Sequence, residues 1–238
     1  MHFFDLDIPA FTRSGVRQEI VSFLQGNNFH QIITLNAEIL VAARRSSIFH
    51  NVIRKADLLV IDGSGPLFVA WLLGLRELPA RVTGTDIIVF AMDEAQSHAL
   101  RVFLFGGESG EGEKAALVLS ERYPDSIIEA WPSGKIRRDD DGWHGHDEAF
   151  VACKAFAPQI VFVALGHEKQ ERFIDEIVSQ VPSVRLAVGV GGVFTLLSGR
   201  VKPAPVWMRR LGFEWLWRGL KEPWRWRRII TAVIVFPL

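Results

Sequence analysis

Cysteine is almost absent from this chain, with Cys153 as its only copy, so no disulfide can form within it. A lone thiol is typical of proteins in a reducing compartment. The first residues also lack the basic and then apolar layout of a secretory signal peptide. We therefore expect a cytoplasmic protein.

Long hydrophobic runs are missing too. The longest, residues 229–238, is interrupted only by Thr231 and has ten residues, whereas a helix needs about 20 to cross a bilayer. The 20 glycines and 11 prolines follow no period, which excludes a fibrous protein. Because 49% of the residues are apolar, a disordered chain is also excluded. These absences leave a globular protein.

Two common nucleotide-binding fingerprints are lacking. No G-x-x-x-x-G-K-[ST] sequence occurs, which removes the P-loop classes. The dinucleotide fingerprint G-x-G-x-x-G is absent from the first expected strand-to-helix turn, and the nearest run, Gly106, Gly107 and Gly110, has the wrong spacing. A nicotinamide or flavin oxidoreductase is therefore the weaker alternative among nucleotide-dependent enzymes.

The net charge of zero is an average of two unlike parts. Residues 200–238 hold nine Lys or Arg and two Glu, a net charge of +7, and residues 1–199 carry −7. The same tail holds five of the eight tryptophans. Arginine and tryptophan together suit an anionic membrane surface. We expect a membrane-associating appendage here, with a core-packing helix pair as the alternative, and no nucleic-acid partner.

Residues 1–199 alternate short apolar, β-branched runs with longer amphipathic segments. This alternation predicts an α/β fold with a parallel sheet between two layers of helices. The expected strands are 29–34, 57–61, 101–105, 126–130, 159–165 and 185–190, preceded by one near 3–8. The expected helices are 14–25, 37–54, 66–74, 85–99, 110–122, 147–156 and 169–180, followed by 206–221 and 223–236 in the tail.

Small or polar residues follow most of the expected strands. In an open parallel sheet the ligand crevice lies outside the carboxyl ends of the strands. These positions hold Thr34–Asn36, Asp62–Gly63, Gly106–Gly107, Gly166–Glu171 and Gly191–Gly192. Because glycines let phosphates approach backbone N–H groups, the pattern indicates a nucleotide site.

Seven short strings carry a resemblance to a known family. In chain order they are Thr34–Glu38 (TLNAE), Asp62–Gly63, Arg81–Asp86 (RVTGTD), Leu104–Gly107 (LFGG), Lys169–Glu171 (KQE), Gly189–Phe194 (GVGGVF) and Glu214–Arg218 (EWLWR) with Glu222–Pro223. Together they resemble the WecG/TagA/CpsF glycosyltransferases, glycosyltransferase family 26. No single string is specific, so the weight lies in their order from about residue 30 to the end.

The resemblance implies an inverting hexosyltransferase of bacterial cell-surface polysaccharide biosynthesis. Such an enzyme moves a sugar from a UDP-sugar donor to a polyprenyl-diphosphate-linked acceptor at the inner face of the cell membrane, where it is peripheral. The implied fold is a Rossmann-like catalytic core, residues 1–199, with the helical Trp/Arg-rich appendage at 200–238. Family members use UDP-N-acetylmannosamine, its uronic acid or UDP-glucose, and N-acetylmannosamine is our first choice here.

Asp62 is the candidate catalytic base, which would take the proton from the acceptor hydroxyl. It follows an apolar strand, where partial desolvation would raise the pKa of its carboxyl, and Gly63 leaves room for a sugar. The resemblance also implies a catalytic aspartate at this position. The structural alternative is an aspartate that caps the following helix.

Four core residues are candidates for substrate binding. Thr34 and Asn36 offer hydrogen-bond partners for sugar hydroxyls, although Asn36 could instead cap a helix. The resemblance implies that Arg81 and Gln170 line the same pocket. The Arg81 guanidinium could pair bidentately with phosphate oxygens, with a plain surface arginine as its alternative.

Further binding candidates lie on the nucleotide side and in the tail. Four glycines would line the nucleotide: Gly106, Gly107, Gly191 and Gly192. Glycines at strand ends are often only turn residues. In the tail, Arg218, Arg225 and Arg228 are candidates for binding the leaving diphosphate or the lipid phosphate, and the last two share a helix face.

No metal cofactor is expected. Asp139, Asp140 and Asp141 look like the D-x-D of metal-dependent glycosyltransferases, and His144 and His146 could be ligands. We interpret them as one solvated loop, with no strand to present them and outside the family pattern. Arginines and backbone dipoles would neutralise the diphosphate instead.

Three positions depart from the family pattern. Glu168 stands in place of a proline, Pro203 of an arginine and Trp217 of a tyrosine, while Lys202 could replace the lost charge. These changes bear on the choice of donor or acceptor more than on the reaction. Two other functions stay open: a soluble nucleotide-dependent enzyme of another class, and a catalytically idle membrane adaptor.

Overall fold

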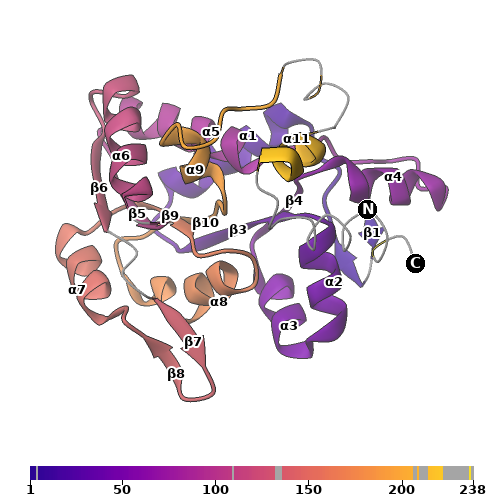
Figure 1. Cartoon of the computed structure of the whole chain (residues 1–238), viewed down its shortest axis with the longest axis horizontal. Helices are drawn as coiled ribbons and strands as arrows, with labels where there is room; N and C mark the ends of the chain where they lie inside the picture. Colours follow the sequence, from indigo (N-terminus) through magenta and orange to yellow (C-terminus); the bar gives the residue numbers. More distant parts are fainter. Residues whose placement is uncertain are drawn as a thin grey trace.

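A six-stranded sheet, with all its strands parallel, forms the centre of the molecule (Figure 1). The computed structural model describes residues 1–3, 5–108, 110–131, 136–205, 208, 214–221 and 236. The strands are ordered β4 (Leu58–Ile61), β3 (His30–Leu35), β10 (Leu186–Gly189), β9 (Ile160–Ala164), β5 (Arg101–Gly106) and β6 (Ile127–Trp131). Every boundary lies within one residue of the sequence-based expectation, which confirms the predicted sheet.

Helices cover both faces of this sheet (Figure 1). One face packs against α1 (Arg13–Gln25), α5 (Gly84–Ser97), α6 (Glu111–Arg122) and the short α9 (Val193–Leu197). The other packs against α2 (Ala37–Arg45), α3 (Ser47–Lys55), α4 (Ser64–Leu72), α7 (Asp147–Phe156), α8 (Lys169–Glu176) and the 3₁₀ turn η1 (Val178–Gln180). The fold is therefore the Rossmann-like α/β architecture that the sequence predicts.

The strands are continuous apolar runs because both faces of the sheet are buried. All four residues of β10 are buried, as are the first four of β9. Successive side chains of a strand point to opposite faces. Ile32 accordingly packs on the α1 and α5 side, whereas Ile33 and Leu35 pack on the α2 and α3 side.

Two expectations near the amino terminus are wrong. The single strand near 3–8 is instead a hairpin of β1 (His2–Phe3) and β2 (Leu6–Asp7), which do not join the main sheet. The helix expected over 37–54 is divided at Ser46, whose backbone is extended and whose Oγ accepts a hydrogen bond from the Phe49 N–H at 3.2 Å. Ser46 thereby ends α2 and caps α3.

The expected loop around Asp139 is also a hairpin. β7 (Arg137–Asp139) and β8 (Gly142–His144) pair antiparallel, with Asp139 opposite Gly142. Gly142 has a φ of +117° at the turn. A tight turn with glycine at a positive φ joins the two short strands, and the interpretation as a strandless loop is wrong.

The segment that follows the sheet is tied to the core. Arg200 forms an ion pair with Glu111 of α6 (Nη1 to Oε1, 3.0 Å), and Ala204 is buried. Of the two expected tail helices, the described residues include α11 (Glu214–Lys221) from the first, and from the second only Phe236, which is 2% exposed in the core of α2, α3 and α4. Within the described part of the chain, no helix is long and apolar enough to cross a membrane.

Candidate functional site

The carboxyl ends of β4 and β3 bring several predicted site residues together. These strands pair with Leu35 opposite Ile61, and the Asp62 N–H donates to the Leu35 carbonyl at 2.7 Å. On the outer side of β4, Ile61 forms a parallel bridge with Arg81. Asp62 therefore lies between Asn36 and Arg81 along this edge of the sheet.

Thr34 and Asp62 belong to the same face of the sheet. Val60 lies opposite Thr34, and Asp62 follows Val60 by two residues, so the pleat places both polar side chains on one side. Thr34 is 6% exposed, whereas Asp62 is half-buried. A Cβ placed on Gly63 would meet no atom of the described residues within 4 Å. The candidate base thus has open space next to it, as a substrate would need.

The helix-cap alternatives turn out differently for Asn36 and Asp62. Asn36 caps α2, because its Oδ1 accepts a hydrogen bond from the Ile39 N–H at 3.0 Å, while its amide Nδ2 takes no part in the cap. For α4 the N-cap residue is Gly63, without a side-chain cap. The cap alternative is therefore correct for Asn36, whereas Asp62 precedes the N-cap residue of α4.

Gln170 is a buried link between α8 and the turn after β10. Its Oε1 accepts from the Gly191 N–H at 3.0 Å, and its Nε2 donates to Glu171 Oε1 at 2.7 Å. A Cβ on Gly189 would lie 2.6 Å from Gln170 Nε2, so any larger residue there would displace the buried Gln170 side chain. Gln170 therefore holds the Gly191–Gly192 turn in place through the Gly191 N–H. Its direct contact with substrate stays a prediction.

Glu171, the last residue of the KQE string, is not among the predicted site residues. Its side chain is 1% exposed, its Oε2 has no hydrogen-bond partner among the described residues, and burial raises the pKa of its carboxyl to about 7. Its backbone carbonyl accepts from Gln31 Nε2 of β3 at 3.0 Å. The KQE string marks Glu171 but does not reveal its burial, because that depends on distant strands packing over the first turn of α8.

The predicted nucleotide-binding glycines have unlike surroundings. A Cβ on Gly106 would lie 2.5 Å from the Ala164 carbonyl oxygen, and one on Gly107 would lie 3.0 Å from Glu111 Cβ. A Cβ on Gly191 would meet only Gln170 Oε1, at 3.9 Å. Packing within the protein thus explains Gly106 and Gly107, whereas Gly191 leaves room for a ligand. Gly192 precedes α9, next to Gly191.

The RVTGTD string has a structural explanation beyond Arg81. Thr83 and Asp86 form a reciprocal capping box at the start of α5. Arg13 of α1 donates two hydrogen bonds of 2.8 Å to the Asp86 carboxylate, and it lowers the pKa of that carboxyl against the opposing effect of burial. The T-x-x-D spacing could have revealed the cap, but not its partner on another helix.

Titratable side chains at the starts of α2 and α8 also meet near this edge. His167, after β9, lies 3.4 Å from Glu38 in the first turn of α2 (Nδ1 to Oε2). Glu168, which departs from the family pattern, has a φ of +66°, which proline cannot adopt. Its carboxylate pairs with Arg172 at 3.1 Å. The departure at Glu168 therefore changes the backbone that leads into α8.

The possible metal ligands of the β7–β8 hairpin are engaged with each other. Asp139 Oδ1 lies 2.7 Å from His144 Nε2 and accepts from the Asp141 N–H at 3.1 Å. Among the described residues, no three His, Cys, Asp or Glu side chains are grouped so that they could hold a metal ion. Metal-independent catalysis stays a prediction.

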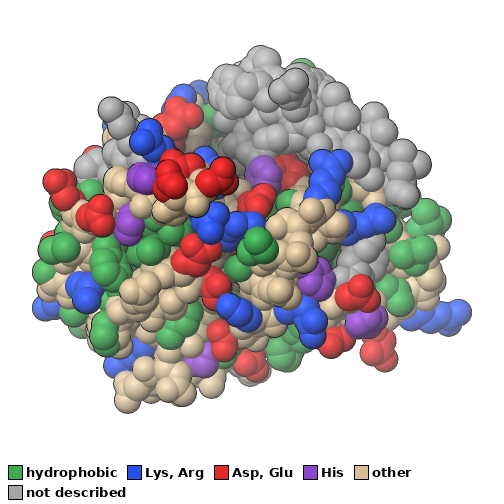
Figure 2. Space-filling model, turned by 90° about the horizontal axis from the view of Figure 1, so that it is seen from below, with side chains coloured by type: hydrophobic (Ala, Val, Ile, Leu, Met, Phe, Trp, Pro, Cys, Tyr) green, Lys and Arg blue, Asp and Glu red, His purple; other side chains and the backbone are tan. Residues whose placement is uncertain are grey.

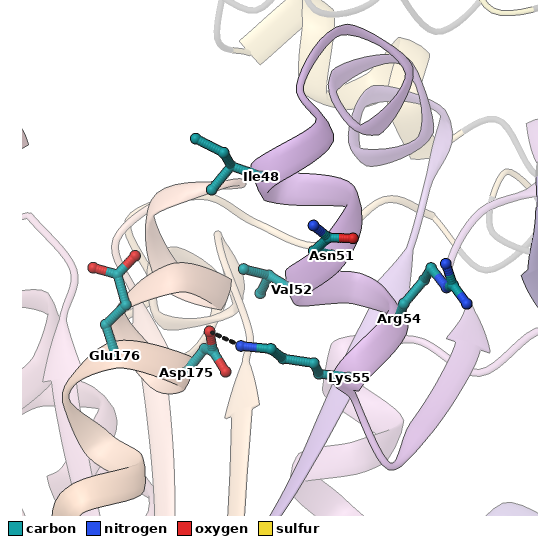
Figure 3. A pocket seen from close by; sticks show the side chains of 7 residues that line it. All are labelled: Ile48, Asn51, Val52, Arg54, Lys55, Asp175 and Glu176. Carbon is teal, nitrogen blue, oxygen red and sulfur yellow. Dashed lines mark hydrogen bonds and ion pairs between the residues drawn. The ribbon is translucent and has the colours of Figure 1, made fainter.

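A pocket between α3 and α8 lies apart from the predicted site (Figure 3). Lys55 and Asp175, which face each other across it, form an ion pair of 3.4 Å (Nζ to Oδ2). Its lining residues are Ile48, Asn51, Val52, Arg54, Lys55, Asp175 and Glu176. None of them is a predicted site residue. The face in Figure 2 mixes acidic and basic side chains.

Most of the tail candidates lie outside the described side chains. Arg225 and Arg228 fall beyond the described residues, and Arg218 is described only as part of α11. Trp217, which departs from the family pattern, contacts the segment after the core here, because its Nε1 donates to the Lys202 carbonyl at 3.0 Å. This bond joins α11 to the segment that leaves the core.

Comparisons with known proteins agree with this geometry. The model of the family described as "Glycosyl transferase WecG/TagA/CpsF family" matches residues 1–238. A Bacillus subtilis protein (strain 168) is 32% identical over 84% of this chain and 75% of its own length. A Bacillus spizizenii protein is 31% identical over 97% of this chain and 85% of its own length. A Staphylococcus aureus protein (strain MRSA252) is 31% identical over 94% of this chain and 84% of its own length.

All three relatives bear the same name, N-acetylglucosaminyldiphosphoundecaprenol N-acetyl-beta-D-mannosaminyltransferase. The match covers the whole sheet and every string on which the resemblance depends. This chain therefore belongs to the WecG/TagA/CpsF family and is a glycosyltransferase.

Proposed function

We propose that this enzyme transfers N-acetylmannosamine from its UDP-sugar to a polyprenyl-diphosphate-linked N-acetylglucosamine. The observation that carries the proposal is the open edge at the end of β4, where Asp62 lies between Asn36 and Arg81 and directly precedes Gly63, the N-cap residue of α4. The relatives' shared name supports this donor and acceptor.

Asp62 acts as the base of an inverting displacement. Its carboxylate takes the proton of the acceptor hydroxyl while the hydroxyl oxygen forms a bond to the anomeric carbon of the donor. The bond from that carbon to the diphosphate oxygen breaks, and its electron pair leaves with UDP. Thr34 and the amide Nδ2 of Asn36 orient the sugars, and Arg81 binds phosphate or acceptor oxygens.

The turn after β10 receives the donor nucleotide. Gly191 has a φ of +52° and open space above it, and Gln170 holds its N–H in place from below. Gly192 extends this turn, and Gly106 and Gly107 would line its far side. Arg218, Arg225 and Arg228 neutralise the leaving diphosphate, so that no metal ion is required.

The enzyme works at the inner face of the cell membrane as a peripheral protein. A polyprenyl-linked acceptor is confined to a bilayer, so the enzyme must reach the bilayer surface. The +7 charge and five tryptophans of residues 200–238 suit anionic lipid headgroups.

A donor panel tests this function. The full-length protein is incubated with a short-chain polyprenyl-diphosphate N-acetylglucosamine and with UDP-N-acetylmannosamine, its uronic acid or UDP-glucose in turn, and released UDP is measured. We expect release that depends on the acceptor and is fastest with UDP-N-acetylmannosamine. The Bacillus subtilis relative serves as a parallel control for the acceptor. If the relative releases UDP and this protein releases none from any donor, the proposal is wrong.

A further inference from the structure

The end of α4 exposes an unusual amount of apolar surface. From Ser64 to Leu75 the chain holds no charged residue. One side of α4 is buried through Pro66, Val69 and Ala70. Four other side chains are 59 to 67% exposed: Phe68, Trp71, Leu72 and Leu73. We call these four the apolar tip.

The apolar tip forms one surface rather than scattered exposed residues. Its four members fall within six consecutive positions, and the rings of Phe68 and Trp71 lie 6.1 Å apart between centroids. Elsewhere Leu117 of α6 and Val151 of α7 are about as exposed, but each stands on a different helix. A helix that is apolar all round needs a nonpolar environment on every side. The core of the protein covers only one side of α4.

The position of the tip relative to the site indicates what covers it. α4 begins directly after Asp62 and Gly63, and its nine residues extend about 14 Å, so the tip lies one short helix from the candidate base. In Figure 1 α4 projects from the edge of the molecule beyond β4. Phe236, near the end of the basic tail, is buried in the same core cluster as Val69 and Ala70.

We propose that the apolar tip of α4 inserts into the boundary between the headgroups and the acyl chains of a lipid bilayer. Tryptophan, phenylalanine and leucine are the side chains that such interfacial segments use, and a helix of this length cannot span the bilayer. Insertion there holds Asp62 within reach of the diphosphate of a membrane-bound acceptor. The inference rests on the proposed function only in that choice of acceptor.

This contact differs from the one proposed for the tail. Attraction between basic residues and anionic lipids weakens as salt is added, because mobile ions screen it. Insertion of uncharged side chains depends on apolar area and persists in salt. The two contributions can therefore be measured separately on the same vesicles.

A single fluorescent label tests the proposal. Leu72→Cys is labelled with a polarity-sensitive dye, with Leu117→Cys as the matched control at an equally exposed leucine. The native Cys153 does not compete, because it is buried and burial raises the pKa of its thiol to about 12. On vesicles of phosphatidylcholine and phosphatidylglycerol we expect a blue-shifted emission from position 72 that persists in high salt, and no shift from position 117.

Substitution gives an independent measurement. Trp71→Ser combined with Leu72→Ser should weaken vesicle binding about ten-fold or more, since it removes two large apolar groups from the lipid, and Leu117→Ser should not change it. Unchanged circular dichroism verifies that the exposed substitutions leave the fold intact.

Three results would overturn the proposal. One is the absence of vesicle binding, and a second is vesicle binding with the label at position 72 still in water. The third is a blue-shifted emission from position 72 that occurs without vesicles and together with a doubling of the mass in sedimentation equilibrium. A second copy of the chain would then cover the tip. Because no transfer reaction is measured, failure of the proposed function would leave these results interpretable.

Discussion

The two halves of the sheet's carboxyl edge use their small residues differently. At the ends of β4 and β9, Cβ positions on Gly63 and Gly166 meet no atom within 4 Å in the described part of the chain, and we call this half the open edge. At the end of β5, a Cβ on Gly106 would strike the Ala164 carbonyl oxygen, and one on Gly112 would lie 2.9 Å from the Gly106 carbonyl oxygen. We call this half the packed edge.

The comparison shows that the same residue type in the same topological place can serve a ligand or the fold. At the open edge Gly63 leaves space next to Asp62. At the packed edge the glycines let backbone approach backbone between β5, β9 and α6. Substitutions at the open edge should therefore alter turnover, and those at the packed edge should alter stability.

The largest expected effect on stability is that of Gly106→Ala. Its φ of +93° and the 2.5 Å approach to the Ala164 oxygen should together lower the free energy of unfolding by about 2–5 kcal/mol. Urea denaturation measures the loss. Gly65→Ala at the open edge is the control, because its Cβ would find only Ala37 Cβ at 3.9 Å. Equal stability of the two variants would contradict the distinction between the edges.

Glu171 should make stability depend on pH. Its pKa, about 7 when folded, exceeds the ordinary value of 4.5, so the folded state holds the proton longer than the unfolded state. Stability therefore falls as pH rises from about 4.5 to about 7 and then levels, by up to about 3 kcal/mol.

Glu171→Gln keeps the acceptor for Gln170 Nε2 and removes the charge. The variant should be more stable than the wild type above pH 7 and equal to it near pH 4, as measured by thermal unfolding across that range. Parallel curves for the two proteins would show that Glu171 does not titrate in this window.

Asn36 combines a structural role, the cap of α2, with a proposed role in sugar binding, and two substitutions separate them. Asn36→Ala removes the cap of α2 and should cost about 1 kcal/mol of stability. Asn36→Ser keeps a capping oxygen but loses the amide Nδ2, so it should retain stability and raise KM for a sugar substrate. If Asn36→Ser leaves KM unchanged, Asn36 is a cap and nothing more.

Metal removal should have the smallest effect. With arginines and backbone dipoles acting on the diphosphate, dialysis against EDTA should leave the rate of UDP release unchanged. Strict dependence on Mg²⁺ or Mn²⁺ would instead direct attention to Asp139, Asp140 and Asp141.

The sheet could be predicted from sequence because strands buried on both faces are continuous apolar runs. A break in a helix that depends on one side chain is harder to predict. At Ser46 the apolar pattern of the helix continues through the cap residue. Asp62, Thr34 and Asn36 could be placed together because parallel strands end at one edge. The buried link from Glu171 through Gln170 to Gly191 could not, since it depends on how individual side chains of α8 pack under the turn after β10.

The central claim is that chemistry belongs to the open edge and to Asp62 in particular. Asp62→Asn keeps the shape of the side chain but is too weak a base to take the hydroxyl proton. It should lower turnover by about 10²–10⁴-fold while the Kd for UDP and the free energy of unfolding stay at wild-type values. Turnover near that of the wild type in a folded, UDP-binding Asp62→Asn protein would contradict the account.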